Sequence, residues 1–219
     1  MHGKTQTTLF KIKRIKKNRP GRLKKLLKKE NQEFFRQFLL NYRKTGAIAA
    51  SSEKLGKKFI ESANIEDADC VVELGSGNGV LTEKIQQHLK PGATFFAMEI
   101  NPYFVKKTQA RCPDVTVYQD SADRIRYYLK QHGVEGCDCV ISGLPWSLFS
   151  KSYQETLLSE IFDSLIEGGD FLTFAYIHGI YLPSGRVYRK ALPDIFKEVQ
   201  HSKIVWNNAP PAIVYKATK

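Results

Sequence analysis

The sequence lacks the features of membrane-spanning and secreted proteins. It contains no run of about 18 apolar residues, the length needed to cross a bilayer. Its most hydrophobic segment, residues 171–182, is interrupted by His178 and Gly179. The basic N-terminus is not followed by the apolar segment of a secretory signal. We therefore expect a cytoplasmic protein with no membrane-spanning helix.

Metal-binding and disulfide patterns are also missing. The chain has 4 cysteines and 5 histidines, and the histidines show no HExxH or similar spacing. The cysteines lie in or beside apolar segments and form no CxxC pair; they are Cys70, Cys112, Cys137 and Cys139. We interpret them as reduced core thiols and expect no metal site.

Acidic residues are scarce in the first fifth of the chain. Residues 1–44 hold 15 of the 34 Lys and Arg residues but only 2 of the 22 Asp and Glu residues, so the remainder is nearly neutral. Such a charge distribution is typical of a segment that contacts a polyanion, which is lipid or nucleic acid. With 219 residues and 42% hydrophobic content, we expect this extension to precede one globular domain, residues 45–219.

The extension contains an amphipathic pattern after the breaker Pro20-Gly21. Apolar residues recur at helical steps over residues 22–44, namely Leu23, Leu26, Leu27, Phe34, Phe38 and Tyr42. This spacing predicts a helix with one apolar face and many lysines on the other. The apolar face either enters a membrane surface or packs on the protein's own domain.

Short apolar runs alternate with helical patterns from Thr45 onward, which indicates an α/β fold with a mostly parallel, doubly wound sheet. We expect strands at residues 70–74, 94–99, 115–119, 137–142, 171–176, 203–206 and 212–217. We expect helices near residues 52–63, 80–89, 103–111, 122–131, 154–166 and 193–199. The final pair of strands suits a seven-stranded sheet better than a six-stranded dinucleotide fold.

The most informative motif is a buried strand that runs into a glycine-rich turn, Glu73-Leu74-Gly75-Ser76-Gly77-Asn78-Gly79. Glycines let the backbone approach a ligand closely, and the next helix offers unpaired amides. The second strand ends at Glu99, whose carboxylate is placed to accept from both hydroxyls of an adenosine ribose. Val80 stands where a dinucleotide site needs its third glycine, so NAD is disfavoured.

The third and fourth strands end in further candidate residues. Asp120, followed by Ser121, is placed to read an adenine amino group, or to cap a helix. The fourth strand ends in Ser142-Gly143-Leu144-Pro145-Trp146, at the edge where open α/β sheets bind ligands. Trp146 either offers a π face to a substrate amine or closes the core.

These motifs resemble class I methyltransferases, and in particular the soluble bacterial phospholipid N-methyltransferases, which are related to the rRNA adenine dimethylases. The matching pieces are Thr45-Gly46-Ala47-Ile48 with Ser51-Ser52, the loop from Glu73 to Gly79, Glu99-Ile100-Asn101, Ser142 to Trp146, and residues 207–212. The resemblance implies a Rossmann-like seven-stranded sheet that binds S-adenosylmethionine. It further implies a peripheral enzyme on the inner face of the cell membrane, which methylates a headgroup amine of phosphatidylethanolamine or an ornithine lipid.

The motifs and the resemblance together give a set of expected site residues. Cofactor-binding residues are Thr45, Gly46, Ile48, Glu73, Gly75, Ser76, Gly77, Gly79, Glu99, Ile100, Asp120, Ser121, Ser142, Gly143 and Leu144. Candidate catalytic residues are Trp146 and Tyr153, as aromatic faces for the growing positive charge, and Tyr176 and His178, as proton acceptors. Tyr176 and His178 are equally compatible with core or loop positions.

The rRNA adenine dimethylases are the main alternative, because 12 Lys and Arg residues before Glu30 suit phosphate contacts equally well. The strand-four motif of those enzymes begins with an asparagine that accepts from the adenine amino group, whereas this chain has Gly143. We therefore favour a lipid over RNA. A third alternative is a protein that binds S-adenosylmethionine without catalysis.

Overall fold

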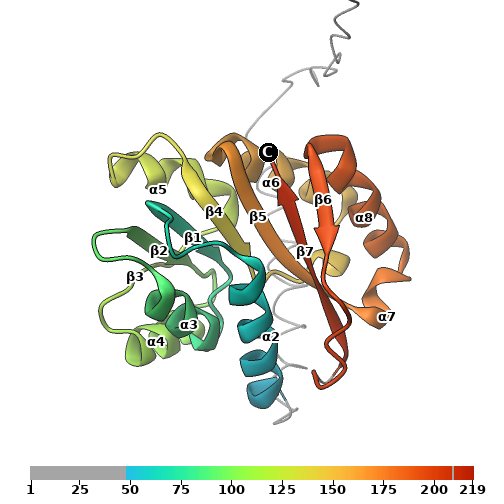
Figure 1. The fold of residues 1–219 in the computed structure, drawn as a ribbon, viewed down its shortest axis with the longest axis horizontal. Helices are drawn as coiled ribbons and strands as arrows, with labels where there is room; N and C mark the ends of the chain where they lie inside the picture. Colours follow the sequence, from blue (N-terminus) through green and yellow to red (C-terminus); the bar gives the residue numbers. More distant parts are fainter. Residues whose placement is uncertain (1–47, 209) are drawn as a thin grey trace, which may run out of the picture.

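A seven-stranded sheet forms the centre of the protein in a computed structural model that describes residues 48–208 and 210–219 (Figure 1). The strands are β1 (Cys70–Leu74), β2 (Thr94–Met98), β3 (Thr116–Tyr118), β4 (Cys137–Ser142), β5 (Leu165–Tyr176), β6 (Glu198–His201) and β7 (Ala212–Thr218). Their order is β3-β2-β1-β4-β5-β7-β6. The first five strands are parallel, and β7 runs antiparallel to β5 and β6. The seven-stranded α/β prediction is confirmed.

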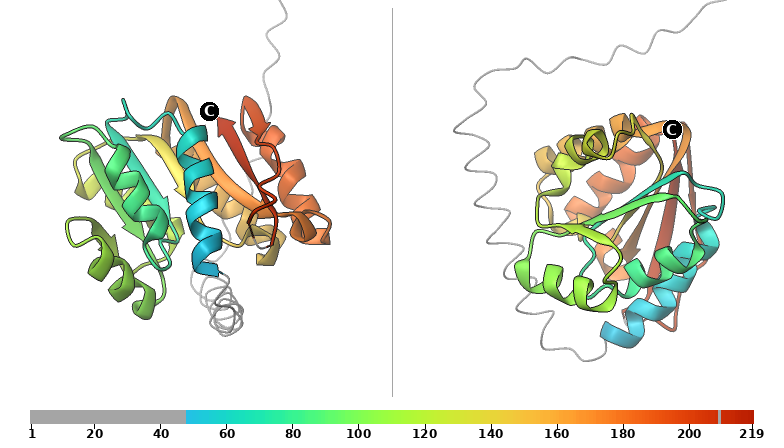
Figure 2. Two further views of the ribbon diagram at one scale, coloured as in Figure 1. Left: turned by 60° about the horizontal axis from the view of Figure 1, so that its bottom comes forward. Right: turned by 90° about the vertical axis from the view of Figure 1, so that its left-hand side faces the viewer.

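Helices cover both faces of this sheet (Figures 1 and 2). One face is covered by α2 (Ile48–Ser62), α3 (Val80–His88) and α4 (Pro102–Arg111). The other face is covered by α5 (Ile125–Gln131), α6 (Lys151–Ser164) and α8 (Pro183–Ile195). The short helix α7 (Ile177–Ile180) follows β5, and single 3-10 turns, Ala122–Arg124 and Trp146–Leu148, precede α5 and α6.

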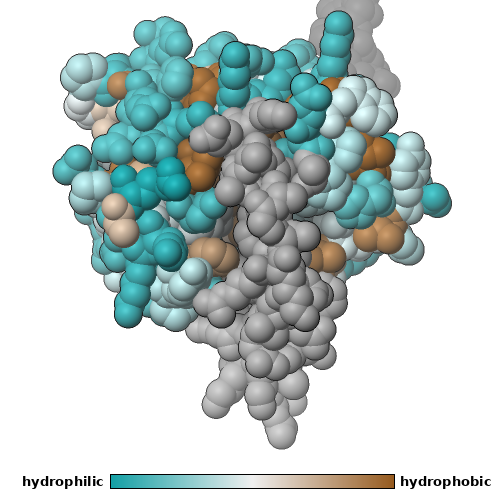
Figure 3. Space-filling model, turned by 90° about the horizontal axis from the view of Figure 1, so that it is seen from below, coloured by the Kyte–Doolittle hydropathy of each residue, from teal (hydrophilic) through white to brown (hydrophobic). Residues whose placement is uncertain are grey.

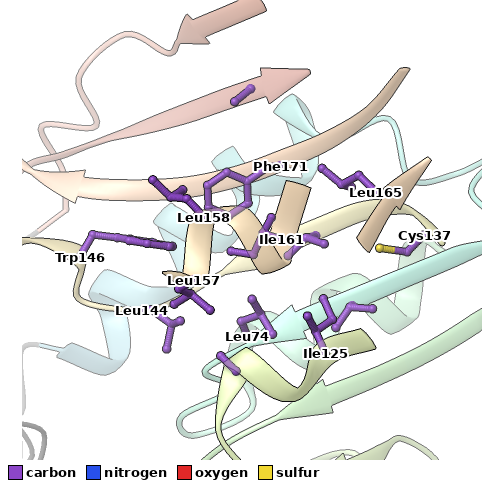
Figure 4. Close-up of a cluster of buried hydrophobic side chains, with 14 of the residues drawn as sticks. Leu74, Ile125, Cys137, Leu144, Trp146, Leu157, Leu158, Ile161, Leu165 and Phe171 are labelled. Carbon is purple, nitrogen blue, oxygen red and sulfur yellow. The ribbon is translucent and has the colours of Figure 1, made fainter. Parts of the chain in front are cut away.

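The core explains why the central strands are continuous apolar runs. Every residue of β1 is buried, because each face of the strand packs against helices. Val71 belongs to the cluster that contains Phe59 of α2, while Val72 belongs to the larger cluster that contains Leu157 and Ile161 of α6 (Figure 4). Burial of this kind contributes about 1.5–3 kcal/mol for each large apolar side chain.

Strand order places two loops side by side at the carboxyl edge. The chain passes from β1 through β2 to β3 in one direction and then returns to β4 on the other side of β1. The loops after β1 and β4 therefore meet where the direction reverses, which is the usual ligand position in such sheets. The Gly143 N–H donates to the Leu74 carbonyl at 2.8 Å, which joins the two strand ends.

Two expected elements near the end of the chain are wrong. The helix expected over residues 193–199 lies earlier, as α8, with Pro183 in its first turn and Pro193 in its last. The first strand of the final hairpin is β6 rather than residues 203–206, because residues 198–201 pair with β7. Residues 203–206 contribute only an isolated bridge, between Val205 and Ala212. The buried Tyr188 and Leu192 define the helix that precedes the expected one.

The expected helical extension, residues 1–44, lies outside the described residues. Within the part of the chain that the structure describes, no helix has both the length and the apolar composition needed to cross a membrane.

Candidate active site

The glycine-rich turn after β1 forms the floor of the site. Gly75, Gly77 and Gly79 all have positive φ angles, of 82°, 57° and 81°, which L-residues with side chains rarely adopt. A Cβ atom at position 77 would have no atom within 4 Å, so open space lies next to this backbone. A ligand can therefore approach the turn closely at Gly77.

Glu99 connects this turn to the end of β2. Its Oε2 accepts from the Gly77 N–H at 3.1 Å, and its Oε1 accepts from the Asn101 N–H at 2.9 Å. Burial raises the pKa of this carboxyl, and backbone N–H groups, including that of Ile100, oppose the shift. The structure thus brings Glu99, Ile100 and Gly77 together; that Glu99 binds a ribose at this corner remains a prediction.

Glu73 is a buried carboxylate with one free acceptor. Its Oε2 accepts from the Thr82 hydroxyl of α3 at 2.6 Å, and no described group donates to its Oε1. Burial raises its pKa to about 8, chiefly because the charged form is desolvated. A buried acceptor without a donor is costly, so this atom fits a bound cationic or N–H group such as the ammonium of S-adenosylmethionine.

Helix α4 supports the turn through two residues that sequence reasoning missed. The Thr108 hydroxyl donates to the Gly77 carbonyl at 3.0 Å and lies 3.0 Å from the Ser76 hydroxyl. Three residues after Thr108, the Arg111 Nε donates to the Asn78 carbonyl at 3.2 Å. The three-residue spacing places Thr108 and Arg111 on one face of α4, and this spacing was the available signal.

The end of β3 carries Asp120 in a fixed orientation. Its Oδ1 accepts from the Ser121 N–H at 2.7 Å, and its Oδ2 accepts from the Tyr128 hydroxyl of α5 at 3.0 Å. The Ser121 hydroxyl lies 3.5 Å from the hydroxyl of Tyr153 on α6. The capping position before the 3-10 turn Ala122–Arg124 is occupied by Ser121 rather than by Asp120. Asp120, Ser121 and Tyr153 therefore lie together, and Tyr128 is a further contact that sequence reasoning missed.

The loop after β4 is held against the glycine-rich turn. The Ser142 Oγ accepts from the Leu144 N–H at 3.3 Å and from the Trp146 Nε1 at 3.2 Å. A Cβ atom at position 143 would lie 2.7 Å from the Gly75 carbonyl oxygen, so Gly143 is required by the close approach of the two backbones. Leu144 contacts the same turn, 2.9 Å from the Cβ position of Gly75.

The role expected for Trp146 as an open aromatic face is wrong. Its side chain is only 2% exposed and stacks on Tyr188 of α8, with ring centroids 4.5 Å apart. Phe149 and Phe171 pack against it in T-shaped arrangements, with ring centroids 6.0 and 5.8 Å away. Figure 4 shows Trp146 and Phe171 in this cluster. Trp146 therefore closes the core beneath the loop, because apolar side chains from α8 and β5 already occupy its faces.

Gln154 fixes the position of this loop and was also missed. Its buried side-chain amide donates to the carbonyls of Trp146, Phe149 and Ser184, at 2.7, 3.3 and 3.3 Å. One side chain of α6 therefore ties the loop after β4 to the first turn of α8. Nothing in the local sequence marks this position, since Gln154 belongs to no motif and its partner Ser184 lies 30 residues away.

Tyr176 lies apart from Tyr153, on the opposite face of the sheet. Tyr176 packs with the α2 cluster, whereas Tyr153 packs with the α6 cluster. The Tyr176 ring stacks on the exposed His178 ring, with centroids 5.6 Å apart. Burial raises the pKa of Tyr176, so its phenol remains protonated at neutral pH and is unsuited to accept a proton. For His178 the accepting role remains a prediction.

Three predicted residues at the start of the domain are not placed by the structure. Thr45 and Gly46 lie outside the described residues, and Ile48 is described only through its backbone, at the first position of α2. Their expected contact with the cofactor remains a prediction.

Comparisons with known proteins agree with this site. Residues 71–169 match the family of the methyltransferase domain. An ornithine lipid N-methyltransferase from Singulisphaera acidiphila is 26% identical over 185 residues, which cover 83% of this chain and 92% of the relative. The ribosomal RNA small subunit methyltransferase A of Thermotoga maritima is 32% identical over 104 residues, but these cover only 35% of that protein.

A solved structure shows the same architecture. The O-methyltransferase from Bacillus cereus, in complex with SAH, aligns with a TM-score of 0.60 at 12% identity, over 86% of this chain and 90% of that one. Residues 71–169 contain the glycine-rich turn, the Glu99 corner, Asp120 and the loop after β4. The chain is therefore an S-adenosylmethionine-dependent methyltransferase with a Rossmann-like fold.

Proposed function

We propose that this enzyme methylates the amine of a membrane lipid headgroup, such as that of phosphatidylethanolamine or an ornithine lipid. The observation that carries the proposal is the packing of Gly143. A side chain at this position would clash with the Gly75 backbone, so the loop after β4 provides no amide to hold an adenine amino group. The ornithine lipid N-methyltransferase relative, which is matched over nearly its whole length, supports the same conclusion.

The residues of the site have distinct roles in this proposal. Glu99 and the turn around Gly77 hold the nucleoside, Asp120 binds the adenine, and the free oxygen of Glu73 accepts from the amino group of the methionine part. Bound S-adenosylmethionine supplies a methyl group on a positively charged sulfur. Positioning of the acceptor amine then gives most of the rate acceleration, because little acid–base chemistry is needed.

Tyr153 and His178 are proposed to act on the acceptor. Tyr153 is half-buried beside Ser121, where its ring can favour the positive charge that develops on the amine. His178 is exposed beyond the end of β5 and can accept the proton that a primary ammonium must lose before it reacts. The basic segment, residues 22–44, is proposed to hold the enzyme on an anionic membrane surface.

The proposal is tested with purified protein and S-adenosylmethionine that carries an isotope-labelled methyl group. Vesicles that contain phosphatidylethanolamine or ornithine lipid are one substrate, and ribosomal RNA is the other. We expect label in mono-, di- or trimethylated headgroups, identified by mass spectrometry, and none in RNA. The variant Glu99→Ala is the matched control for cofactor-dependent transfer.

The RNA alternative has one specific observation in its favour, which is the identity of 32% to the ribosomal RNA methyltransferase. Label in adenine of RNA, without label in lipid, would establish that alternative and reject the lipid proposal. Cofactor binding without label in either substrate would indicate a binding protein.

A further inference from the structure

Three exposed hydrophobic side chains, called the patch below, lie on segments at the carboxyl edge of the sheet, outside the cofactor site. It consists of Tyr181, Leu182 and Trp206, which are 63%, 42% and 69% exposed. Among the described residues, Trp206 and Tyr181 are the most exposed of the large hydrophobic side chains. Exposure of such side chains is costly in water, so three of them at one edge of the sheet suggest a contact surface.

The three side chains come from segments that the sheet brings together. Ala212 pairs with Tyr176 at the end of β5 and forms a bridge with Val205, the residue before Trp206. The Ile177 N–H donates to the Pro211 carbonyl at 2.9 Å, and α7 then leads directly to Tyr181. In Figure 1, α7 and the loop between β6 and β7 accordingly lie at the same lower edge.

The segments that carry these side chains are basic in sequence. Residues 177–193 contain Arg186, Arg189 and Lys190 but no Asp or Glu, and Lys203 precedes Trp206 by three positions. In the described part of the chain, no salt bridge involves Arg186, Lys190 or Lys203. The view onto the carboxyl edge shows separate hydrophobic areas among hydrophilic side chains (Figure 3). This surface therefore combines apolar side chains with an excess of positive charge.

We propose that the patch of Tyr181, Leu182 and Trp206 docks on an anionic lipid surface, as a second contact besides the basic segment of residues 22–44. Tryptophan and tyrosine side chains favour the membrane–water interface, and nearby Lys and Arg are attracted to anionic headgroups. Docking at this edge turns the end of β5, with His178, toward the lipid headgroups. The docking proposal rests on the proposed lipid substrate, because an enzyme that methylates a lipid headgroup must present its site to the membrane.

Tryptophan fluorescence reports on this contact directly. The chain has 2 tryptophans, and Trp146 is 2% exposed whereas Trp206 is 69% exposed. When the full-length protein binds vesicles of phosphatidylcholine and phosphatidylglycerol, we expect the emission to shift to shorter wavelength. We also expect lipids with brominated acyl chains to quench it. Both signals should disappear in Trp206→Phe, and vesicles of phosphatidylcholine alone should give a far smaller signal.

Sedimentation with the same vesicles measures the contribution of the patch to binding. The double variant Tyr181→Ser with Leu182→Ser should weaken vesicle binding by about tenfold. Ile166→Ser is the matched control, because Ile166 is 44% exposed but lies at the start of β5, at the opposite edge. Its vesicle binding should stay within about twofold of the wild type. Calorimetry with S-adenosylmethionine verifies that each variant is folded.

Specific results would overturn the docking proposal. If the protein sediments with vesicles while Trp206 is neither shifted nor quenched, membrane contact is made elsewhere in the chain. If RNA, but not vesicles, changes the Trp206 emission, the patch contacts nucleic acid. The proposed lipid substrate can fail separately from docking. If Trp206 is quenched but no lipid is methylated, the substrate proposal is rejected and docking stands. If detergent-dispersed lipid is methylated but Trp206 is not quenched by vesicles, docking is rejected and the substrate proposal stands.

Discussion

Gly143 and Gly75 are in direct backbone contact, since a Cβ atom at position 143 would lie 2.7 Å from the Gly75 carbonyl oxygen. Position 143 follows β4 and position 75 follows β1, so this contact joins the two loops that frame the site. It makes the loop after β4 and the glycine-rich turn depend on each other, because any larger residue at position 143 must displace the turn.

We expect Gly143→Ala to weaken S-adenosylmethionine binding by about tenfold, because a displaced turn misplaces the ligand's contacts. Isothermal titration calorimetry measures the effect. Gly56→Ala in α2 is the matched control, since the added carbon would meet only the flexible end of Lys84. Unchanged affinity in Gly143→Ala would show that the two loops move independently.

Glu99→Gln should weaken S-adenosylmethionine binding by about 10- to 100-fold, as loss of a buried charged hydrogen-bonding group does. The carboxylate accepts from the Gly77 and Asn101 N–H groups, and one amide nitrogen cannot replace an oxygen in these contacts. Calorimetry gives the affinity, and Glu66→Gln at an exposed position is the control. Equal affinity of both variants for S-adenosylmethionine would show that Glu99 does not contribute to cofactor binding.

Glu73 should make the ligand-free protein less stable as pH rises. Its pKa in the folded protein is about 8, against an ordinary value of 4.5, so the folded state holds this proton more tightly than the unfolded state. The stabilisation is complete below the unfolded pKa and is lost as pH rises toward the folded pKa. Between about pH 5 and pH 8, we expect the wild type to lose a few kcal/mol relative to Glu73→Gln.

Urea denaturation of both proteins at the two pH values measures this difference. The neutral glutamine keeps the size of the side chain but cannot ionise, so the variant provides the reference for all other titrating groups. Parallel pH profiles for wild type and variant would contradict a raised pKa at Glu73.

Sequence patterns predicted the central sheet because its determinants are local. The strands at residues 70–74 and 137–142 have the predicted bounds, since each is an apolar run between polar segments. The sequence also predicted the positions of the glycine-rich turn and of Glu99, because repeated glycines mark the turn and Glu99 directly follows an apolar run. Prediction failed where pairing decides the structure: residues 198–201 become a strand only because β7 lies beside them.

The same distinction applies within the site. The burial of Trp146 depends on Tyr188 and Phe171, which lie far along the chain, so its immediate neighbours could not indicate it. Thr108 supports the turn through a contact that spans 31 residues, and Tyr128 supports Asp120 from the next helix along the chain. Such supporting residues carry no motif of their own and emerge only when the packing is known.

Tyr128→Phe should weaken S-adenosylmethionine binding by about three- to tenfold. The Tyr128 hydroxyl donates to Asp120 Oδ2 at 3.0 Å and so fixes the carboxylate expected to bind adenine. Tyr127→Phe is the matched control, because the Tyr127 hydroxyl accepts from Gln131 rather than contacting Asp120, and its ring is exposed. A double-mutant cycle with Asp120→Asn should show that the effects are not additive. Additive effects would mean that Tyr128 acts elsewhere.

Trp146→Ala should destabilise the protein by about 3–5 kcal/mol, as removal of a large core aromatic does. The stack with Tyr188 and the hydrogen bond to Ser142 are lost together, and the loop after β4 loses its support. Trp206→Ala should change the free energy of unfolding by less than about 0.5 kcal/mol, because that ring is exposed. Urea denaturation of the two variants compares the same chemical deletion in the core and on the surface. If instead Trp146→Ala left stability unchanged and abolished only turnover, the ring would contact substrate, and its position in the core would not describe the working enzyme.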